Sequence, residues 1–163
     1  MRVGIVLGSR SQWTTMKHTA ELLAKLGIPY EARIITANKN ANKLHDYVSK
    51  AVSRGLEIII AGSTEKVYLA DIITSKTEVP VLSIKFIASS KKKNIDDSNA
   101  DNNNGNSIRA LDTGPEDAAN AALLAASMLV DKYPRIRQKL IDYRSQNQCE
   151  KSSKKFIDTL LKH

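Results

Sequence analysis

The sequence predicts an α/β fold in three layers, a parallel sheet of four to five strands between two layers of helices. Four short apolar runs, rich in branched side chains, lie at 2–7, 30–36, 57–61 and 79–84. Continuous apolar runs of this length are typical of strands buried on both faces. Segments with apolar residues at helical spacing alternate with these runs, and this alternation indicates a parallel sheet with helices on both faces.

The first two strand–helix units follow from their periodicity. The run RVGIVL at 2–7 precedes apolar residues at helical spacing, and Gly27 with Pro29 ends this helix. The second strand, YEARIIT at 30–36, leads into a polar loop. The apolar positions of the second helix are Leu44, Tyr47, Val48 and Ala51, and Gly55 closes it.

The third run, EIIIA at 57–61, has the composition of a central strand. A short helix at 67–74 and the fourth strand at 79–84 come next. Residues 88–106 contain almost no apolar side chain and many Asn, Asp and Lys, so we expect a mobile polar loop there. After this loop, 107–111 fits a short edge strand.

The most apolar helix is expected at 115–133. Pro115 suits a first helical turn, and Glu116 and Asp117 suit the positive end of the helix. The run AANAALLAASMLV is apolar nearly all round, so this helix should be buried on more than one side. In a chain of this size, burial of a second side of the helix indicates contact with a neighbouring subunit.

The C-terminal part of the chain is basic. Residues 131–163 carry nine Lys and Arg against four Asp and Glu, in a chain whose net charge is +8. Because no aromatic side chains alternate with the basic ones, nucleic acid is not an expected partner. Two helices, around 135–146 and 152–162, should extend from the core. We therefore divide the chain into an α/β domain at 1–147 and a basic C-terminal helix at 148–163.

Composition restricts the classes of protein further. With 163 residues, 42% of them hydrophobic, the chain suits one globular domain with a full core. No apolar run approaches the roughly 20 residues of a membrane span, and no N-terminal leader is evident, so no membrane partner is expected. The single cysteine, Cys149, excludes an internal disulfide and favours a cytoplasmic location. The histidines His18, His45 and His163 lie far apart in sequence, so no metal site is predicted.

An anion-binding loop is expected where the first strand ends. The stretch IVLGSRSQW at 5–13 passes from a strand through Gly8 and Ser9 directly into a helix. Backbone N–H groups at such a junction can hold a phosphate. His18 and His45 fall within the first and second helices, away from this loop, and we expect no catalytic role for them.

Four segments together resemble a known family. They read VLGSRSQWTTM, TANKNANKL, IIAGSTEKVYLADIITSKTEVPVLSI and GPEDAANAALLAASML, and their order and spacing are those of the class I PurE proteins. That family comprises the 5-(carboxyamino)imidazole ribonucleotide mutases, also described as the catalytic subunit of phosphoribosylaminoimidazole carboxylase, of de novo purine synthesis. The resemblance implies a flavodoxin-like or Rossmann-like sandwich that forms a homo-octamer with active sites between subunits. It also implies transfer of a carboxylate to the imidazole ring carbon without a metal or an organic cofactor.

The resemblance extends only partly to the functional loops. The first loop of the family reads GSxSDW, and its Ser and Asp side chains hold the substrate; Ser9 and Ser11 match, but Gln12 replaces the Asp. The second reads SAHRTP, in which His moves a proton and Arg binds phosphate; here Asn38 and Lys39 take those places. The third is glycine-rich and carries a second His, whose position Tyr68 occupies. The substrate-binding residues implied by the resemblance are Gly8, Ser9, Ser11, Gln12, Thr36, Asn38, Lys39 and Gly62.

These replacements leave three functions open. Asn38 cannot exchange a proton near neutral pH, and loss of a positioned general acid typically costs about 10²–10⁴-fold in rate. The chain could carry out the mutase reaction with relocated acid–base groups. It could instead be a catalytically inactive relative that binds a ribonucleotide, or serves as a structural or regulatory subunit beside an active PurE chain. A third alternative is a different small-molecule enzyme on the same scaffold.

Overall fold

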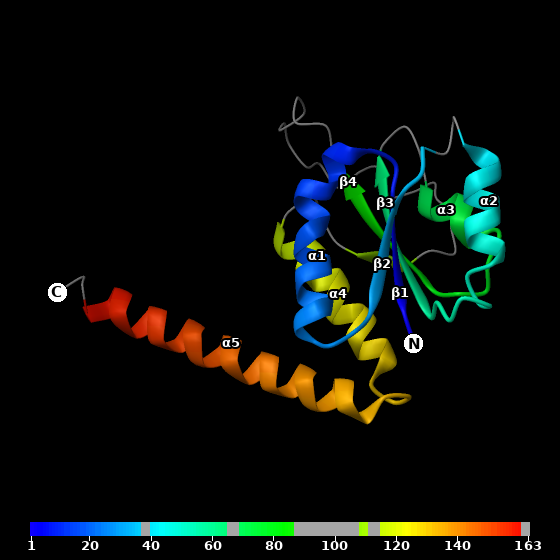
Figure 1. The fold of residues 1–163 in the computed structure, drawn as a ribbon. Coiled ribbons are helices and arrows are strands. Elements are labelled where there is room, and N and C mark those ends of the chain that lie inside the picture. Colours follow the sequence, from blue (N-terminus) through cyan, green and yellow to red (C-terminus); the bar gives the residue numbers. More distant parts are fainter. Residues whose placement is uncertain (37–39, 65–68, 87–107, 111–114, 161–163) are drawn as a thin grey trace.

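Five parallel strands form one sheet in the order β2-β1-β3-β4-β5 (Figure 1). This computed structural model describes residues 1–36, 40–64, 69–86, 108–110 and 115–160. The strands are β1 (Val3–Leu7), β2 (Tyr30–Ile34), β3 (Ile58–Thr64), β4 (Val81–Phe86) and β5 (Ile108–Ala110). The predicted parallel sheet is therefore confirmed, with β3 at its centre and β5 at one edge.

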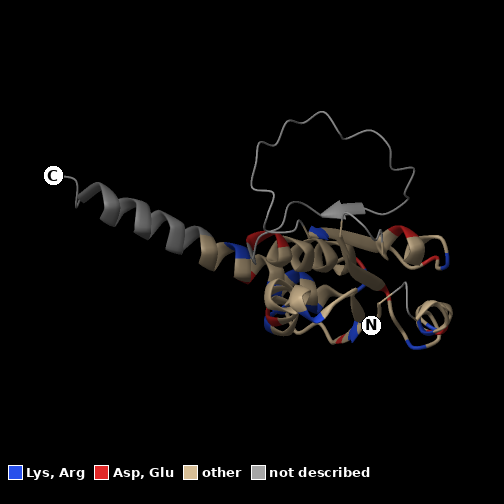
Figure 2. Ribbon diagram, turned by 90° about the horizontal axis from the view of Figure 1, so that it is seen from above, with Lys and Arg blue, Asp and Glu red and all other residues tan. Residues whose placement is uncertain are grey.

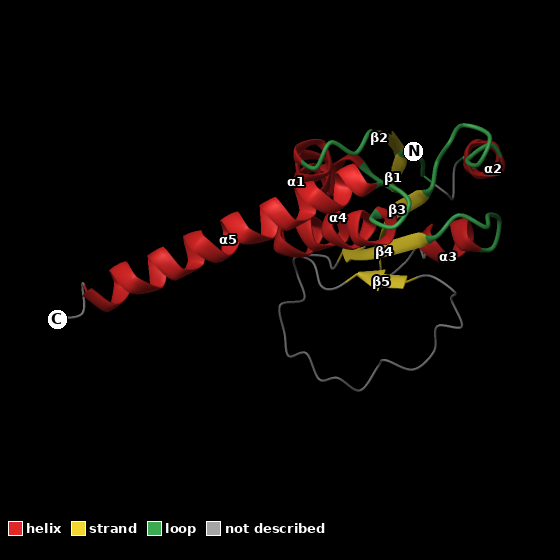
Figure 3. Cartoon of the chain, turned by 90° about the horizontal axis from the view of Figure 1, so that it is seen from below, coloured by secondary structure: helices red, strands yellow, loops and turns green. Residues whose placement is uncertain are grey.

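Helices cover both faces of the sheet (Figures 1 and 3). They are α1 (Trp13–Lys25), α2 (Ala41–Ser49), α3 (Leu69–Thr74), α4 (Pro115–Leu129) and α5 (Pro134–Leu160), and a short 3-10 turn, Arg10–Gln12, precedes α1. The helices α1 and α4 and the start of α5 pack on one face, whereas α2 and α3 pack on the other. The three-layer architecture is thus as predicted.

Alternation of side chains along the buried strands divides the core in two. Ile5 and Leu7 of β1 pack toward α1 and α4 in one cluster of buried residues. Val6, between them in sequence, packs toward α2 and α3 in the other. Successive side chains of a strand point to opposite faces, so a strand that is apolar at every position can fill both layers. This explains why the run at 2–7 shows no polar alternation.

The edge strand β2 differs from the other strands in its exposure. Four of its five residues are exposed, and the Ile34 side chain keeps 49% of its surface accessible. Its neighbour in the sheet is β1, whose residues are all buried. Val3 pairs with Tyr30, and Leu7 pairs with Ile34. In the isolated chain, β2 therefore presents an incompletely covered face.

The C-terminal helix corrects one prediction. We expected two helices, around 135–146 and 152–162, but α5 is one continuous helix from Pro134 to Leu160 that extends away from the domain (Figure 1). The stretch between the expected helices lacks apolar periodicity, yet it contains no Gly or Pro. Its Gln, Glu and Lys residues are good helix formers, so the backbone continues without interruption.

The Ala-rich helix α4 is buried mainly on the side that meets α1 and the sheet. Ala118, Ala121, Ala122 and Ala125 are fully buried. Leu124 and Met128, one turn apart on another side, remain 36% and 38% exposed. The expected burial on more than one side is therefore incomplete within a single chain.

Candidate functional site

The carboxyl ends of β1 and β3 lie side by side at one edge of the sheet. Leu7 at the end of β1 pairs with Gly62 of β3. From β1 the chain crosses to β2 through α1 on one face, and it returns from β2 to β3 through α2 on the opposite face. In open parallel sheets with this strand order, ligands usually bind in a crevice outside the strand ends at such a reversal, which is here the edge between β1 and β3.

Gln12 organises the loop after β1. Its side-chain Oε1 accepts hydrogen bonds from the backbone N–H of Gly8 at 2.8 Å and from that of Ser9 at 3.3 Å. The same oxygen lies 3.3 Å from the place where a Cβ atom on Gly62 would stand. The carboxamide therefore lies between the ends of β1 and β3, and it already satisfies two of the backbone donors that we expected to face a phosphate.

The other end of the Gln12 carboxamide has no partner among the described residues. The side chain is only 4% exposed, and its Nε2 atom is buried without a hydrogen bond. Leaving a buried donor unpaired typically costs about 1–3 kcal/mol. The buried Nε2 donor would therefore be stabilised by a hydrogen-bond acceptor at this position.

Three hydroxyl groups lie at the same edge of the sheet. The hydroxyls of Ser9 and Ser11 are 2.8 Å apart, and both residues are exposed. Thr36, after β2, donates its hydroxyl to the Gly8 carbonyl oxygen at 3.1 Å. The structure thus brings together Gly8, Ser9, Ser11, Gln12 and Thr36, which come from two separate loops.

The end of β3 completes the described part of the site. Gly62 is buried, and a methyl group added there would lie 3.0 Å from Leu7 Cδ2 and 3.0 Å from Phe86 Cε2. The buried Ser63 hydroxyl accepts a hydrogen bond from the Ala70 backbone N–H at 3.1 Å and so joins β3 to the start of α3. Gly62 therefore allows close packing at the wall of the crevice.

Other residues of the predicted site lie outside the described residues. These are Asn38, Lys39 and Tyr68, and the polar segment 88–106 also lies there. His18 is on α1 with its Nδ1 3.5 Å from Glu21 Oε2, and His45 is exposed on α2. Both histidines therefore lie on helices, as predicted.

Charge and metal-ligand chemistry give no competing site in the described part of the chain. No group of three or more His, Cys, Asp or Glu residues gathers there as potential metal ligands. Lys and Arg are interspersed with Asp and Glu over the described helices and loops (Figure 2). None of the described helices is both long and apolar enough to span a membrane.

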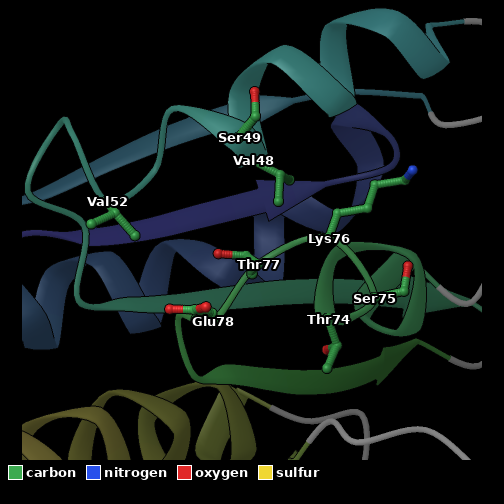
Figure 4. Close-up of a pocket in the computed structure, with 8 residues that line it drawn as sticks. All are labelled: Val48, Ser49, Val52, Thr74, Ser75, Lys76, Thr77 and Glu78. Atoms are coloured by element: carbon green, nitrogen blue, oxygen red, sulfur yellow. The ribbon is translucent and has the colours of Figure 1, made fainter.

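A groove lies away from this edge, between α2 and the connection from α3 to β4 (Figure 4). This groove has a volume of about 470 Å³ and is lined by Val48, Ser49, Val52, Thr74, Ser75, Lys76, Thr77 and Glu78. Its four hydroxyl side chains already form hydrogen bonds with nearby backbone groups. The groove therefore offers a ligand few convergent polar groups, and we favour the crevice at the carboxyl edge.

Comparison with known proteins identifies the family of the chain. The family model described as AIR carboxylase matches residues 2–150, which is most of the chain. The chain belongs to this family. The PurE resemblance that the sequence predicts is therefore confirmed.

Two mutases from other organisms match this chain over nearly their whole length. The N5-carboxyaminoimidazole ribonucleotide mutase of Pseudomonas aeruginosa is 39% identical over 150 residues, covering 91% of each chain. The mutase of Vibrio cholerae is 36% identical over 147 residues, covering 89% of this chain and 91% of the relative. A crystal structure of Treponema denticola PurE, 18% identical, superposes with a TM-score of 0.74 over 93% of this chain and 94% of that one, which shows the shared fold.

Sequence reasoning placed Gln12 in the site but missed what it does. The family pattern indicates only that it replaces an Asp, whereas its oxygen accepts from the Gly8 and Ser9 N–H groups and its nitrogen has no hydrogen-bond partner among the described residues. A signal was present, because a Gln three residues after a Ser at the start of a helix is the pattern of a capping box.

Proposed function

We propose that the chain is an N5-carboxyaminoimidazole ribonucleotide mutase that binds its substrate in the crevice between β1 and β3. The observation that carries this proposal is the 39% identity to the Pseudomonas aeruginosa mutase over 91% of both chains. The crevice supports it, because Gly8, Ser9, Ser11 and Thr36 gather at the edge where such sheets bind ligands.

In the proposed reaction the carboxylate moves within one molecule. The bond between the carboxylate carbon and the exocyclic nitrogen breaks, and a bond from that carbon to the imidazole ring carbon forms. The ring carbon loses a proton and the exocyclic nitrogen gains one, so no external oxidant or reductant is needed. We assign substrate contacts to Gly8, Ser9, Ser11, Gln12, Thr36, Asn38 and Gly62, and phosphate binding to Lys39.

A second candidate is a nucleotide-binding relative without turnover. It is favoured by Asn38 and Tyr68, which stand at the two family His positions. The described groups that meet around Gln12 are hydroxyls and amides, none of which titrates near pH 7. A chain of this kind would act as a structural or regulatory subunit, with an active PurE chain as its partner.

Turnover distinguishes the two candidates. Purified protein is incubated with N5-carboxyaminoimidazole ribonucleotide, and the ring-carboxylated product is quantified beside the Pseudomonas aeruginosa mutase as the active control. A rate comparable to that control supports the mutase. No turnover, together with calorimetric binding of the product nucleotide, supports the second candidate. Absence of both turnover and binding contradicts both.

We further propose that the chain is a cytoplasmic homo-oligomer, an octamer by resemblance. The partly exposed Leu124 and Met128 on α4, and Ile141 on α5 at 51% exposure, offer apolar surface for such contacts. Sedimentation velocity should give the mass of eight chains. Replacing Leu124 and Met128 with Glu should reduce that mass, and a monomeric wild-type protein would contradict the assembly.

A further inference from the structure

We infer that Gln12 is a specificity-determining residue whose side-chain amide donates a hydrogen bond to an anionic oxygen of the ligand. The inference rests on the proposed function, since it concerns the same crevice. It adds the direction of one hydrogen bond, in which the protein is the donor and the ligand is the acceptor. A carboxylate oxygen or a phosphate oxygen has the required chemistry.

The hydrogen bonds around Gln12 determine which end of its carboxamide is which. Oε1 faces two backbone N–H donors, those of Gly8 and Ser9. If the group were rotated by half a turn, its NH₂ would face the same two donors, and both hydrogen bonds would be lost. The donor end of the carboxamide therefore points away from the Gly8–Ser9 backbone.

That donor end is unpaired in the described part of the chain although the side chain is 96% buried, as its 4% exposure shows. Native proteins rarely leave a buried donor unpaired without a structural or functional reason. The carboxamide lies between the ends of β1 and β3, where a ligand is expected. A bound oxygen would supply the missing acceptor, and an ionised one would give the stronger hydrogen bond. Because Nε2 is sealed from solvent, the surrounding side chains must shift slightly to admit that oxygen.

Replacement of Gln12 with Glu distinguishes donation of a hydrogen bond to the ligand from structural support of the Gly8–Ser9 loop. Glu keeps the length of the side chain and an oxygen that can accept from Gly8 and Ser9, but an ionised Glu has no donor. A structural role would thus survive the change, whereas a donor role would not. Gln146→Glu, at an exposed position on α5, makes the same change of charge away from the crevice and is the matched control.

The experiment measures nucleotide affinity by calorimetry and the thermal midpoint by calorimetric scanning. For Gln12→Glu we expect affinity for the ring-carboxylated imidazole ribonucleotide to fall roughly 10- to 150-fold, the range that corresponds to loss of a hydrogen bond to a charged group. The thermal midpoint should fall, because an ionised carboxylate is costly at a buried position, so affinity is measured well below that midpoint, and Gln146→Glu should bind normally. Equal affinity in wild type and Gln12→Glu would overturn the inference.

A measurement on the wild-type protein covers the case in which Gln12→Glu does not fold. The side-chain ¹⁵NH₂ signal of Gln12 is followed by NMR during titrations with the ring-carboxylated nucleotide, its decarboxylated counterpart, its phosphate-free nucleoside, ribose 5-phosphate and inorganic phosphate. A shift only with the ligands that carry the ring carboxylate assigns the acceptor to that group. A shift with every phosphate-bearing ligand assigns it to the phosphate.

The outcomes keep the two proposals apart. If no imidazole ribonucleotide binds, the proposed function fails, but a Gln12 shift with ribose 5-phosphate or inorganic phosphate still supports the donor role. If nucleotides bind and shift the backbone signal of Gly62 while the Gln12 side chain stays unchanged, the donor role is overturned and the proposed function stands. If the Gln12 signal responds to none of these probes, the donor role is also overturned.

Discussion

The Thr19 hydroxyl donates a hydrogen bond to the Ala118 carbonyl oxygen at 2.6 Å, and this bond joins α1 to α4. Thr19 is fully buried among apolar side chains of the same layer. Thr19→Val keeps the shape and removes the hydroxyl, so the free energy of unfolding should fall by about 1 kcal/mol. Urea denaturation measures the change, with exposed Thr14→Val on the same helix as the control. Equal effects of the two substitutions would show that the hydrogen bond contributes nothing.

Gly4 and Tyr47 should be coupled in stability. A methyl group on Gly4 would stand 2.6 Å from the Tyr47 hydroxyl oxygen, which is buried without a hydrogen bond among the described residues. Gly4→Ala should therefore destabilise the protein by about 1–3 kcal/mol through overpacking. Tyr47→Phe removes the obstructing oxygen and should recover much of that loss in the double variant. Strictly additive effects in this double-mutant cycle would contradict the steric explanation.

Gly62→Ala should weaken ligand binding more than it weakens the fold. The added methyl group would lie 3.3 Å from Gln12 Oε1 and 3.0 Å from Leu7 Cδ2, so it would displace the carboxamide at the crevice. We expect a loss of about tenfold or more in nucleotide affinity, equivalent to at least about 1.4 kcal/mol. Gly55→Ala is the control, since Gly55 has φ of +76° and open space around its Cβ position. That control should lower stability and leave affinity unchanged; the same loss of affinity in both variants would contradict the explanation.

The Glu57 carboxylate should contribute stability that depends on pH. Burial alone would raise its pKa, but hydrogen bonds from Tyr133 and Lys132 and the charge of Lys132 outweigh burial, so the pKa of Glu57 is lowered. A lowered folded-state pKa gives stabilisation that is complete above the ordinary value of 4.5 and is lost as the pH falls through the folded-state value.

Comparison of wild type with Glu57→Gln tests this dependence. The difference in the free energy of unfolding should be constant between about pH 7 and pH 5.5 and should shrink below about pH 4.5. Exposed Glu78→Gln removes a carboxylate elsewhere on the surface and is the control. A difference that grows as the solution becomes more acidic would have the wrong sign for a lowered pKa.

The strands and most helices could be predicted because their buried positions carry apolar residues in a regular pattern. The apolar run of β1 and the central position of β3 follow from side chains that fill both layers. The continuity of α5 could not be predicted in this way, because the stretch between the two expected helices has no apolar periodicity to mark it. There, intrinsic helix propensity and the absence of Gly and Pro determine the backbone instead.

For the candidate site, the sequence offers a prediction of its position but not of its internal hydrogen bonds. The Gly8–Ser9 turn after a strand indicates the carboxyl edge, and the strand order places Gly62 beside it. Nothing in the sequence alone selects Gln12 Oε1 as the acceptor for the Gly8 and Ser9 N–H groups, because the nearby Ser9 and Ser11 hydroxyls are alternative acceptors. That choice depends on how the turn before α1 orients each side chain.

Binding of an imidazole ribonucleotide in the crevice between β1 and β3 is tested most directly by backbone NMR. The ring-carboxylated nucleotide is titrated into ¹⁵N-labelled protein, and the amide signals of the two strand ends are compared with those of the groove in Figure 4. We predict saturable shifts at Gly8, Ser9, Gly62 and Ser63, with Ser75 and Thr77 unchanged. Shifts confined to the groove, or no saturable shift at Gly8 and Gly62, would contradict the placement of the site.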